Sequence, residues 1–277
     1  MKFKFKSLVI ASAFMAAGGA HAVTATINQG GSLVYGDYTI SGLTGSGTLT
    51  FSQDLLDTLN LGVVGVSGVA PATSVIAGTV GGYSSVSAAA PVLSLTGDAT
   101  GPNITITGVG TAGGATQTVT QDGVDNGVAN GTGFVTIKDL RVDLVNQDVY
   151  ATIVGDNGVN TQTNVKVWHY LNIQGDTTFN LDAIVAAGGT YTANTTLSNL
   201  KIYKTAFDFL AQGTNLNDFG KNTLAGVNDG ALGYGTITSS ITVSVSKAMP
   251  AVPEPGTYAL MGLGLAAIGF VARRKAR

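Results

Sequence analysis

The chain contains no cysteine, and charged residues make up only 11% of its 277 residues. Without cysteine it cannot form a disulfide framework, a zinc–thiolate site or a cysteine nucleophile. Its stability must therefore come from the core and the sheet hydrogen bonds, or from bound ions. Glutamate is almost missing as well, because Glu254 is the sole glutamate of the chain. Tryptophan occurs once and histidine twice.

The middle of the chain is acidic. Residues 23–247 contain fifteen aspartates against six lysines and Arg141. This balance argues against nucleic-acid binding, which requires a basic patch. The low charge and the 39 glycines are typical of an exported all-β domain with many turns, and not of a charged disordered tail.

The first 22 residues predict a secretory signal peptide. Lysines at positions 2, 4 and 6 precede an apolar run over 8–17, and Ala20 and Ala22 form a small-x-small cleavage site. The apolar run is too short for a membrane anchor, which is the alternative. We therefore expect cleavage after Ala22, which leaves His169 as the one histidine of the mature chain.

The other end has three parts, which we expect to follow the β-rich domain from residue 248 onward. Pro253, Glu254 and Pro255 form an extended, accessible stretch, because proline cannot continue a helix. Residues 256–272 carry no charge and as a helix would span roughly 25 Å. A basic group at 273–277 should hold that end in the cytoplasm; it consists of Arg273, Arg274, Lys275 and Arg277. The alternative is a permanent membrane anchor with a proline-containing stem.

Residues 252–256, the apolar segment and the basic end together resemble the PEP-CTERM sorting signal of exported proteins from Gram-negative bacteria. The resemblance covers about the last 26 residues. It implies an exosortase as partner, transient insertion in the inner membrane, removal of the tail and delivery to the cell surface or the exopolysaccharide matrix. It implies nothing about the fold of residues 23–247.

The middle domain shows alternation with a period of two, which predicts antiparallel strands. In TITSSITVSVS the residues Ile237, Ile241, Val243 and Val245 share one face. In VTIKDLRVDLV the parity changes across 138–139, so we expect a β-bulge there. Residues 146–148 should form a hairpin turn, and 155–158 a further turn. The pattern predicts an all-β antiparallel sandwich or barrel-like domain.

Two short helices should interrupt the strands. One follows a Ser52 cap in SQDLLDTLNLG, and the other follows a Thr205 cap in TAFDFLAQG and ends at Gly213. Residues 62–133, rich in glycine, valine, alanine, serine and threonine, could form short strands or loops. Within them, 120–133 reads as a solvated loop.

The segment NVKVWHYLNI carries the most distinctive side chains. By parity it divides into an apolar face (Val165, Val167, His169, Leu171, Ile173) and an opposite face (Lys166, Trp168, Tyr170, Asn172). We expect His169 to be a partly buried core residue. Trp168 and Tyr170 are either exposed rings that could stack on sugars or a second core face beneath another layer. Haem ligation by His169 or Tyr170 is a further alternative.

Other chemistry has weaker support in the sequence. Most aspartates fall in turns, where local backbone bonding favours them, so a glycosidase pair cannot be selected. Asp122, Asp125 and Asn126 resemble half of a calcium loop, but their spacing departs from the EF-hand pattern. No G-x-S-x-G motif accompanies His169. We therefore predict neither a metal site nor a cofactor.

The run GFVTIKDLRVDLVNQDVYATIVG is similar to surface domains of the HtaA type, some of which bind haem. The leading hypothesis is nevertheless a non-enzymatic structural protein of the envelope, cell surface or biofilm matrix. The alternatives are a carbohydrate- or haem-binding surface module that uses the Trp168–Tyr170 strand, and a secreted hydrolase with an aspartate pair.

Overall fold

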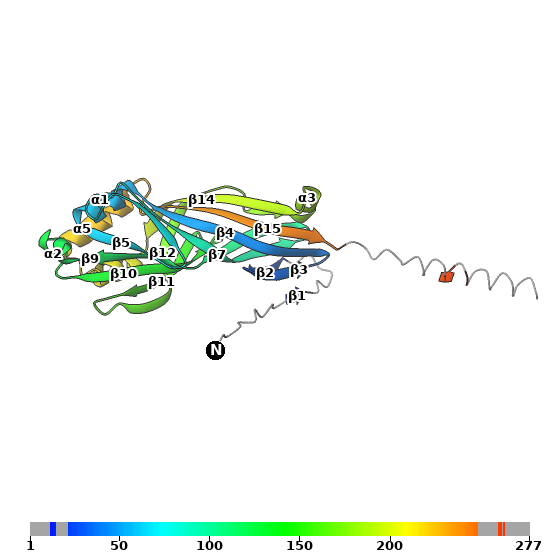
Figure 1. Cartoon of the computed structure of the whole chain (residues 1–277), viewed down its shortest axis with the longest axis horizontal. Coiled ribbons are helices and arrows are strands. Elements are labelled where there is room, and N and C mark those ends of the chain that lie inside the picture. The colour runs from blue at the N-terminus through cyan, green and yellow to red at the C-terminus, as the bar shows by residue number, and fades with distance from the viewer. Residues whose placement is uncertain (1–11, 15–21, 249–259, 262, 264–277) are drawn as a thin grey trace, which may run out of the picture. The chain divides into compact units, whose positions relative to one another are not determined.

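The computed structural model describes residues 12–14, 22–248, 260, 261 and 263. The chain divides into two units, Met1–Ser246 and Lys247–Arg277, and the fold described below is that of the first. Antiparallel strands dominate it (Figure 1). The all-β antiparallel class predicted from the alternation is therefore confirmed.

The first half of the sheet is built from nine strands of three to sixteen residues. They are β1 (Ser12–Phe14), β2 (Val23–Asn28), β3 (Ser32–Tyr35), β4 (Tyr38–Phe51), β5 (Val64–Val69), β6 (Thr73–Ala77), β7 (Ser85–Thr100), β8 (Asn103–Thr111) and β9 (Gly114–Val119). Residues 62–133, which the sequence left open between short strands and loops, thus contain the sixteen-residue strand β7.

The second half of the sheet consists of six further strands. They are β10 (Gly133–Asp143), β11 (Asp148–Gly155), β12 (Asn160–Gln174), β13 (Thr178–Asn180), β14 (Thr190–Ile202) and β15 (Gly235–Lys247). The predicted bulge in β10 is confirmed by a register shift between Lys138 and Arg141, with Asp139 at φ 56°. The predicted hairpin joins β10 to β11, and β15 buries its predicted apolar face.

The strand pairings form a closed ring. The order β4-β15-β14-β12-β11-β10-β8-β7 returns to β4 through the β4–β7 pairing. Two clusters of buried side chains lie inside the ring, one around Val135, Trp168 and Leu210 and the other around Leu43, Val92 and Leu181. Val109 packs against both clusters.

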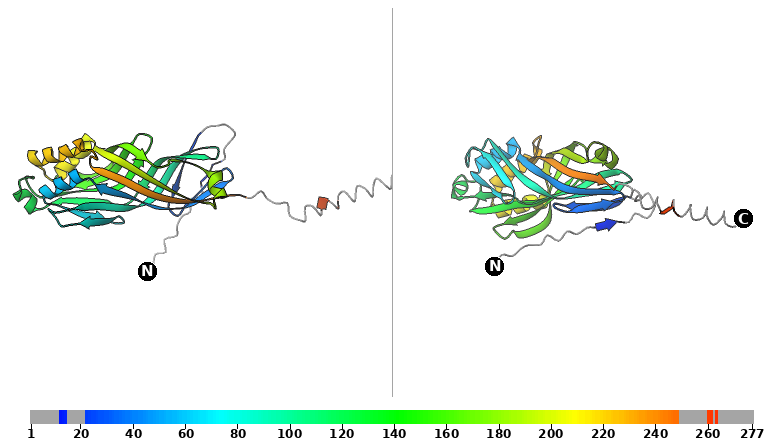
Figure 2. Two further views of the ribbon diagram at one scale, coloured as in Figure 1. Left: turned by 90° about the horizontal axis from the view of Figure 1, so that it is seen from above. Right: turned by 45° about the vertical axis from the view of Figure 1, so that its right-hand side comes forward.

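Five α-helices lie in the described part of the first unit, where the sequence predicted two. They are α1 (Gln53–Leu61), α2 (Gln121–Asp125), α3 (Leu181–Ala186), α4 (Lys204–Gly213) and α5 (Asp218–Gly226), and a 3₁₀ turn follows at Val227–Asp229. α1, α2 and α5 gather at one end of the sheet and α3 lies at the other (Figure 1). Figure 2 shows the same separation from two further directions.

The predicted helices are found with one correction. Ser52 caps α1 as expected, because its side chain accepts a hydrogen bond from the Leu55 amide. Thr205, however, is not the cap of α4: the helix begins at Lys204, and its N-cap position is Tyr203, which makes no side-chain cap bond. Tyrosine is not one of the preferred N-cap residues, and the Tyr203 hydroxyl donates to Asp148 instead.

The helices that the sequence did not indicate depend on tertiary contacts. α5 contains Gly220, which normally weakens a helix, but a Cβ at this position would collide with the Val128 carbonyl group. Residues 120–133, predicted to be a solvated loop, form α2 and bury Val128 and Ala129. That prediction was wrong because small apolar residues in a glycine-rich segment carry no periodic signal.

Most of the C-terminal segment lies outside the described residues, including nearly all of the predicted membrane segment 256–272. Leu260, Met261 and Leu263 are described and are helical. Within the part of the chain that the structure describes, no helix is long and apolar enough to cross a membrane.

Candidate functional site

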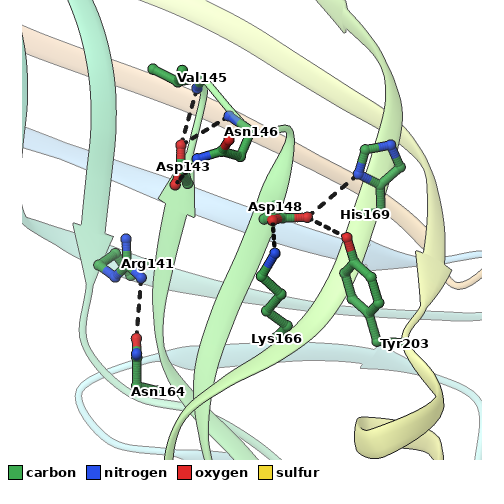
Figure 3. Close-up of polar contacts among 9 residues, drawn as sticks. All are labelled: Arg141, Asp143, Val145, Asn146, Asp148, Asn164, Lys166, His169 and Tyr203. Carbon is green, nitrogen blue, oxygen red and sulfur yellow. Dashed lines mark hydrogen bonds and ion pairs between the residues drawn. The ribbon is translucent and has the colours of Figure 1, made fainter.

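Four polar side chains meet beside β11 and β12, where β14 leads into α4. Asp148 opens β11, Lys166 and His169 lie on β12, and Tyr203 stands between β14 and α4. We call these four residues the Asp148 cluster. Figure 3 shows the three partners converging on the Asp148 carboxylate from different sides.

A β-bulge brings Lys166 and His169 to the same side of β12. Asp148 pairs with His169, and Tyr150 pairs with Lys166, so the register shifts between Val149 and Tyr150. Without this shift, positions 166 and 169 would point to opposite faces, because side chains alternate along a strand. Bulges commonly re-aim side chains in this way.

The Asp148 carboxylate is the centre of the cluster. Its side chain is only 3% exposed, and it accepts hydrogen bonds from Tyr203 Oη at 2.5 Å and Lys166 Nζ at 2.6 Å. His169 Nδ1 lies 3.4 Å from the same carboxylate. The three partners thus compensate the burial of a charge that would be costly if it were unpaired.

The electrostatics of the cluster keep Asp148 ionised. Burial alone raises the pKa of this carboxyl group, but hydrogen bonds from Lys166, Tyr203 and His169 outweigh it and hold the pKa below its ordinary value. The hydrogen bond to Asp148, followed by burial, raises the pKa of the Tyr203 hydroxyl. Both groups therefore keep their ordinary charge states at neutral pH, with tyrosine as the donor and aspartate as the acceptor.

A cationic and aromatic surface borders the cluster. The Arg141 guanidinium lies 4.1 Å from the centroid of the Tyr150 ring, and its Nη2 donates a 3.1 Å hydrogen bond to Asn164. Lys166 Nζ lies 5.7 Å from the Tyr150 ring and 5.6 Å from the Tyr203 ring. Such cation–π contacts hold long basic side chains close to the sheet.

The preceding turn is stabilised separately. Asp143 accepts hydrogen bonds from the backbone amides of Val145 and Asn146 and from the Asn146 side chain (Figure 3). Burial raises the pKa of Asp143, but these hydrogen bonds prevail and lower it. This turn fixes the point at which β11 begins, and therefore the position of Asp148.

One ring nitrogen of His169, Nε2, does not face Asp148. His169 is 34% exposed at its side chain, and a carboxylate beside Nδ1 favours the tautomer in which Nδ1 carries the proton. Nε2 is then the basic nitrogen. A histidine oriented in this way by a carboxylate can ligate a metal ion, accept a proton or bind a polar ligand.

The structure corrects the predicted faces of β12. His169 was expected on the buried apolar face, together with Leu171 and Ile173, but Leu171 is 48% and Ile173 is 37% exposed. Trp168 and Tyr170 are buried, at 3% and 0% exposure, which agrees with the alternative that they form a second core face. The bulge at Val167–Trp168 exposes Leu171 and Ile173, because the side-chain parity reverses across it.

Trp168 and Tyr170 are therefore not an exposed platform for stacking on sugars. The Tyr170 hydroxyl lies 3.4 Å from the Leu144 carbonyl oxygen. Burial, together with the negative charges of Asp143 and Asp148, raises the pKa of Tyr170 to about 12. Tyr170 is thus a protonated core residue and is not available as a surface ligand.

The remaining predicted residues lie mostly elsewhere. The cleavage residue Ala20, the motif Pro253–Pro255 and the basic residues 273–277 lie outside the described residues, and Ala22 begins the described domain. Asp122 and Asp125 belong to α2 and not to a calcium loop. Among the described residues, no group of three or more histidine, cysteine, aspartate or glutamate side chains could hold a metal ion.

Sequence reasoning missed Asp148 and Tyr203 as site residues. Asp148 follows Asn146 and Gln147 and has the features of an ordinary turn aspartate. Tyr203 ends a strand-like run, and nothing local marks its hydroxyl. Their proximity, over a separation of 55 residues, arises from the β11–β12–β14 pairing.

Comparison with known proteins identifies the tail. No curated protein matches the chain. Among solved structures, it is similar to the haem-binding protein HtaB from Corynebacterium glutamicum, with 11% sequence identity and a TM-score of 0.37 over 81% of this chain and 98% of that one. Residues 251–275 match the PEP-CTERM protein-sorting motif. The chain thus carries a PEP-CTERM sorting motif, which implies an exosortase-targeted protein of the envelope or cell surface.

Proposed function

We propose that this chain is a non-enzymatic structural protein of the cell surface or exopolysaccharide matrix, sorted and trimmed by an exosortase. The observation that carries the proposal is the motif match over 251–275. β15 ends at Lys247, so the folded domain leads almost directly into this segment. The signal peptide at 1–22 supplies the export step that such processing requires.

The roles within the tail follow from its chemistry. Glu254 is the sole glutamate of the chain, and its carboxylate can pair with a basic group of the processing enzyme. The uncharged segment 256–272 holds the protein in the inner membrane until cleavage. The basic residues at 273–277 prevent complete export, because positive charge is retained on the cytoplasmic side.

The experiment is intact-mass analysis of the protein from a host that has an exosortase and from the same host without it. We expect the wild-type protein released at the surface to lack the tail. Glu254→Ala should stay membrane-bound with its tail uncut, while neutral replacements of the basic residues should weaken retention. A wild-type surface protein that still ends at Arg277 would show a permanent anchor and would refute the sorting proposal.

The described domain offers little support for a hydrolase. A glycosidase needs one carboxyl group whose pKa is raised, so that it can act as an acid. The pKa values of Asp143 and Asp148 are both shifted downward, which is the opposite of what such an acid requires. Both are committed to local hydrogen bonds.

A haem-binding surface module is the second candidate, and one observation favours it. His169 Nδ1 faces the buried Asp148 carboxylate, which leaves Nε2 free to ligate iron, as in other histidine ligands held by a carboxylate. Lys166, half exposed beside it, could pair with a propionate group.

Titration of the protein with ferric haem tests this candidate. Binding through His169 predicts a Soret band that His169→Ala abolishes and that Asn172→Ala, on the same strand, preserves. Identical spectra for wild type and His169→Ala would eliminate the haem candidate and leave the sorting proposal untouched.

A further inference from the structure

The interior of the closed sheet contains an apolar cavity of about 90 Å³. Leu55 of α1 and Leu210 of α4 line it at one end, and strand residues such as Val142 and Ile237 line its sides. Val109, which packs against both core clusters, also lines it. The cavity therefore lies where the two clusters meet without filling the space between them.

Trp168 gives this cavity a polar feature. It lines the cavity and is 3% exposed. Its buried Nε1 atom has no hydrogen-bond partner among the described residues. An indole N–H can only donate, and a buried donor without an acceptor is rare and destabilising. A ligand with an acceptor atom would satisfy it.

The charge of the cavity wall restricts the ligand. Asp176 is the one charged residue in the lining and also the one exposed residue there, so the cavity reaches the surface beside it. Phe179 and Tyr191 also line the cavity, with ring centroids 5.2 Å apart. A carboxylate at the opening and a wall without lysine, arginine or histidine disfavour an anionic ligand, such as a free fatty acid.

We propose that this cavity binds a small, neutral, mostly apolar molecule with one oxygen acceptor, such as a ketone or an ester, which accepts a hydrogen bond from Trp168 Nε1. Apolar walls and a few polar groups are typical of ligand cavities. A dry cavity of about 150 Å³ in another protein admits benzene, which has six carbon atoms, so the smaller volume of about 90 Å³ here suits a compound of about four non-hydrogen atoms. The proposal is independent of tail processing.

The test uses the full chain in polymer-bounded lipid nanodiscs, with empty nanodiscs as the blank. The probes are acetone and the hydrocarbon in which a methylene group replaces its oxygen. Trp168 is the sole tryptophan, so its fluorescence reports binding to the wild type directly. Calorimetry measures both probes on every variant.

Three variants separate the possible results. Trp168→Phe should weaken ketone binding about fivefold, the equivalent of one hydrogen bond, and change hydrocarbon binding much less. Ala193→Phe should fill the cavity and abolish both, because Ala193 lines it. Asn194→Phe adds the same ring at the neighbouring exposed position and should preserve both.

The proposal is overturned by any of three outcomes. The first is the absence of saturable ketone binding to the wild type, which requires no variant to fold. The second is equal ketone affinity for wild type and Trp168→Phe. The third is a loss of binding in Asn194→Phe as large as that in Ala193→Phe, with both variants folded by circular dichroism.

Discussion

Replacing Asp148 with alanine should destabilise the domain by about 2 kcal/mol. The change removes a buried carboxylate that is 3% exposed and leaves its partners without their shared acceptor. Tyr203 loses most, because its 2.5 Å hydrogen bond joins a neutral donor to an ionised acceptor, a type that contributes about 1.5–3 kcal/mol.

The other two partners should contribute less. Lys166 is 49% exposed, so water can solvate its ammonium group once the carboxylate is gone. His169 Nδ1 is 3.4 Å away, a long distance for a hydrogen bond. Removal of the carboxylate also removes the free-energy cost of burying its charge, so the expected loss of stability stays at about 2 kcal/mol.

Urea unfolding followed by the fluorescence of Trp168 measures the effect. Trp168 adjoins His169 in β12, so the probe reports the strand that carries the site. A double-mutant cycle between Asp148→Ala and Tyr203→Phe should give a larger coupling than the cycle with Lys166→Met. Asp208→Ala breaks the exposed Lys204–Asp208 pair on α4 and serves as a control with little effect.

Two results would refute this reasoning. An Asp148→Ala protein with the unfolding midpoint of the wild type would show that the carboxylate contributes nothing net. A coupling to Lys166 that exceeds the coupling to Tyr203 would show that the exposed ion pair, and not the buried hydrogen bond, stabilises the cluster.

Three further predictions follow from the same structure. The Asp148 pKa is lower in the folded protein than its ordinary value of 3.8. The contribution of Asp148 to stability is therefore complete above that pH and disappears as the pH falls through the folded pKa. Acid unfolding curves should accordingly show less pH dependence for Asp148→Asn than for the wild type. Ser52→Ala should cost about 1–2 kcal/mol in urea unfolding, because it removes the cap of α1, whereas a cost near zero would deny the cap. Leu200→Ala on β14 should cost about 2–5 kcal/mol because Leu200 is 0% exposed, whereas Leu171→Ala on β12, at 48% exposure, should cost under about 0.5 kcal/mol; similar losses for both would contradict the exposed position of Leu171.

Local sequence was sufficient to predict those features that depend on neighbouring residues alone. The alternation of β15 predicted its buried face, because one side of the strand faces the core. Ser52 predicted the start of α1, since a helix cap is made within four residues. The parity change at Lys138–Asp139 predicted the β10 bulge, and the terminal residues alone predicted the PEP-CTERM motif at 251–275.

Only the tertiary structure decided the rest. The bulge in β12 has no signature in the sequence, because Val167 and Trp168 are both apolar and both suit a core. Its position depends on the register with β11, so the sequence left open whether Trp168 and Tyr170 are buried, and it could not predict that Leu171 and Ile173 are exposed. The Asp148 cluster likewise joins side chains from β11, β12 and the start of α4, which only the strand order brings together. The closure of the sheet through β4 and β7 created the cavity, whose volume depends on how two core clusters meet and on no pattern within a single strand.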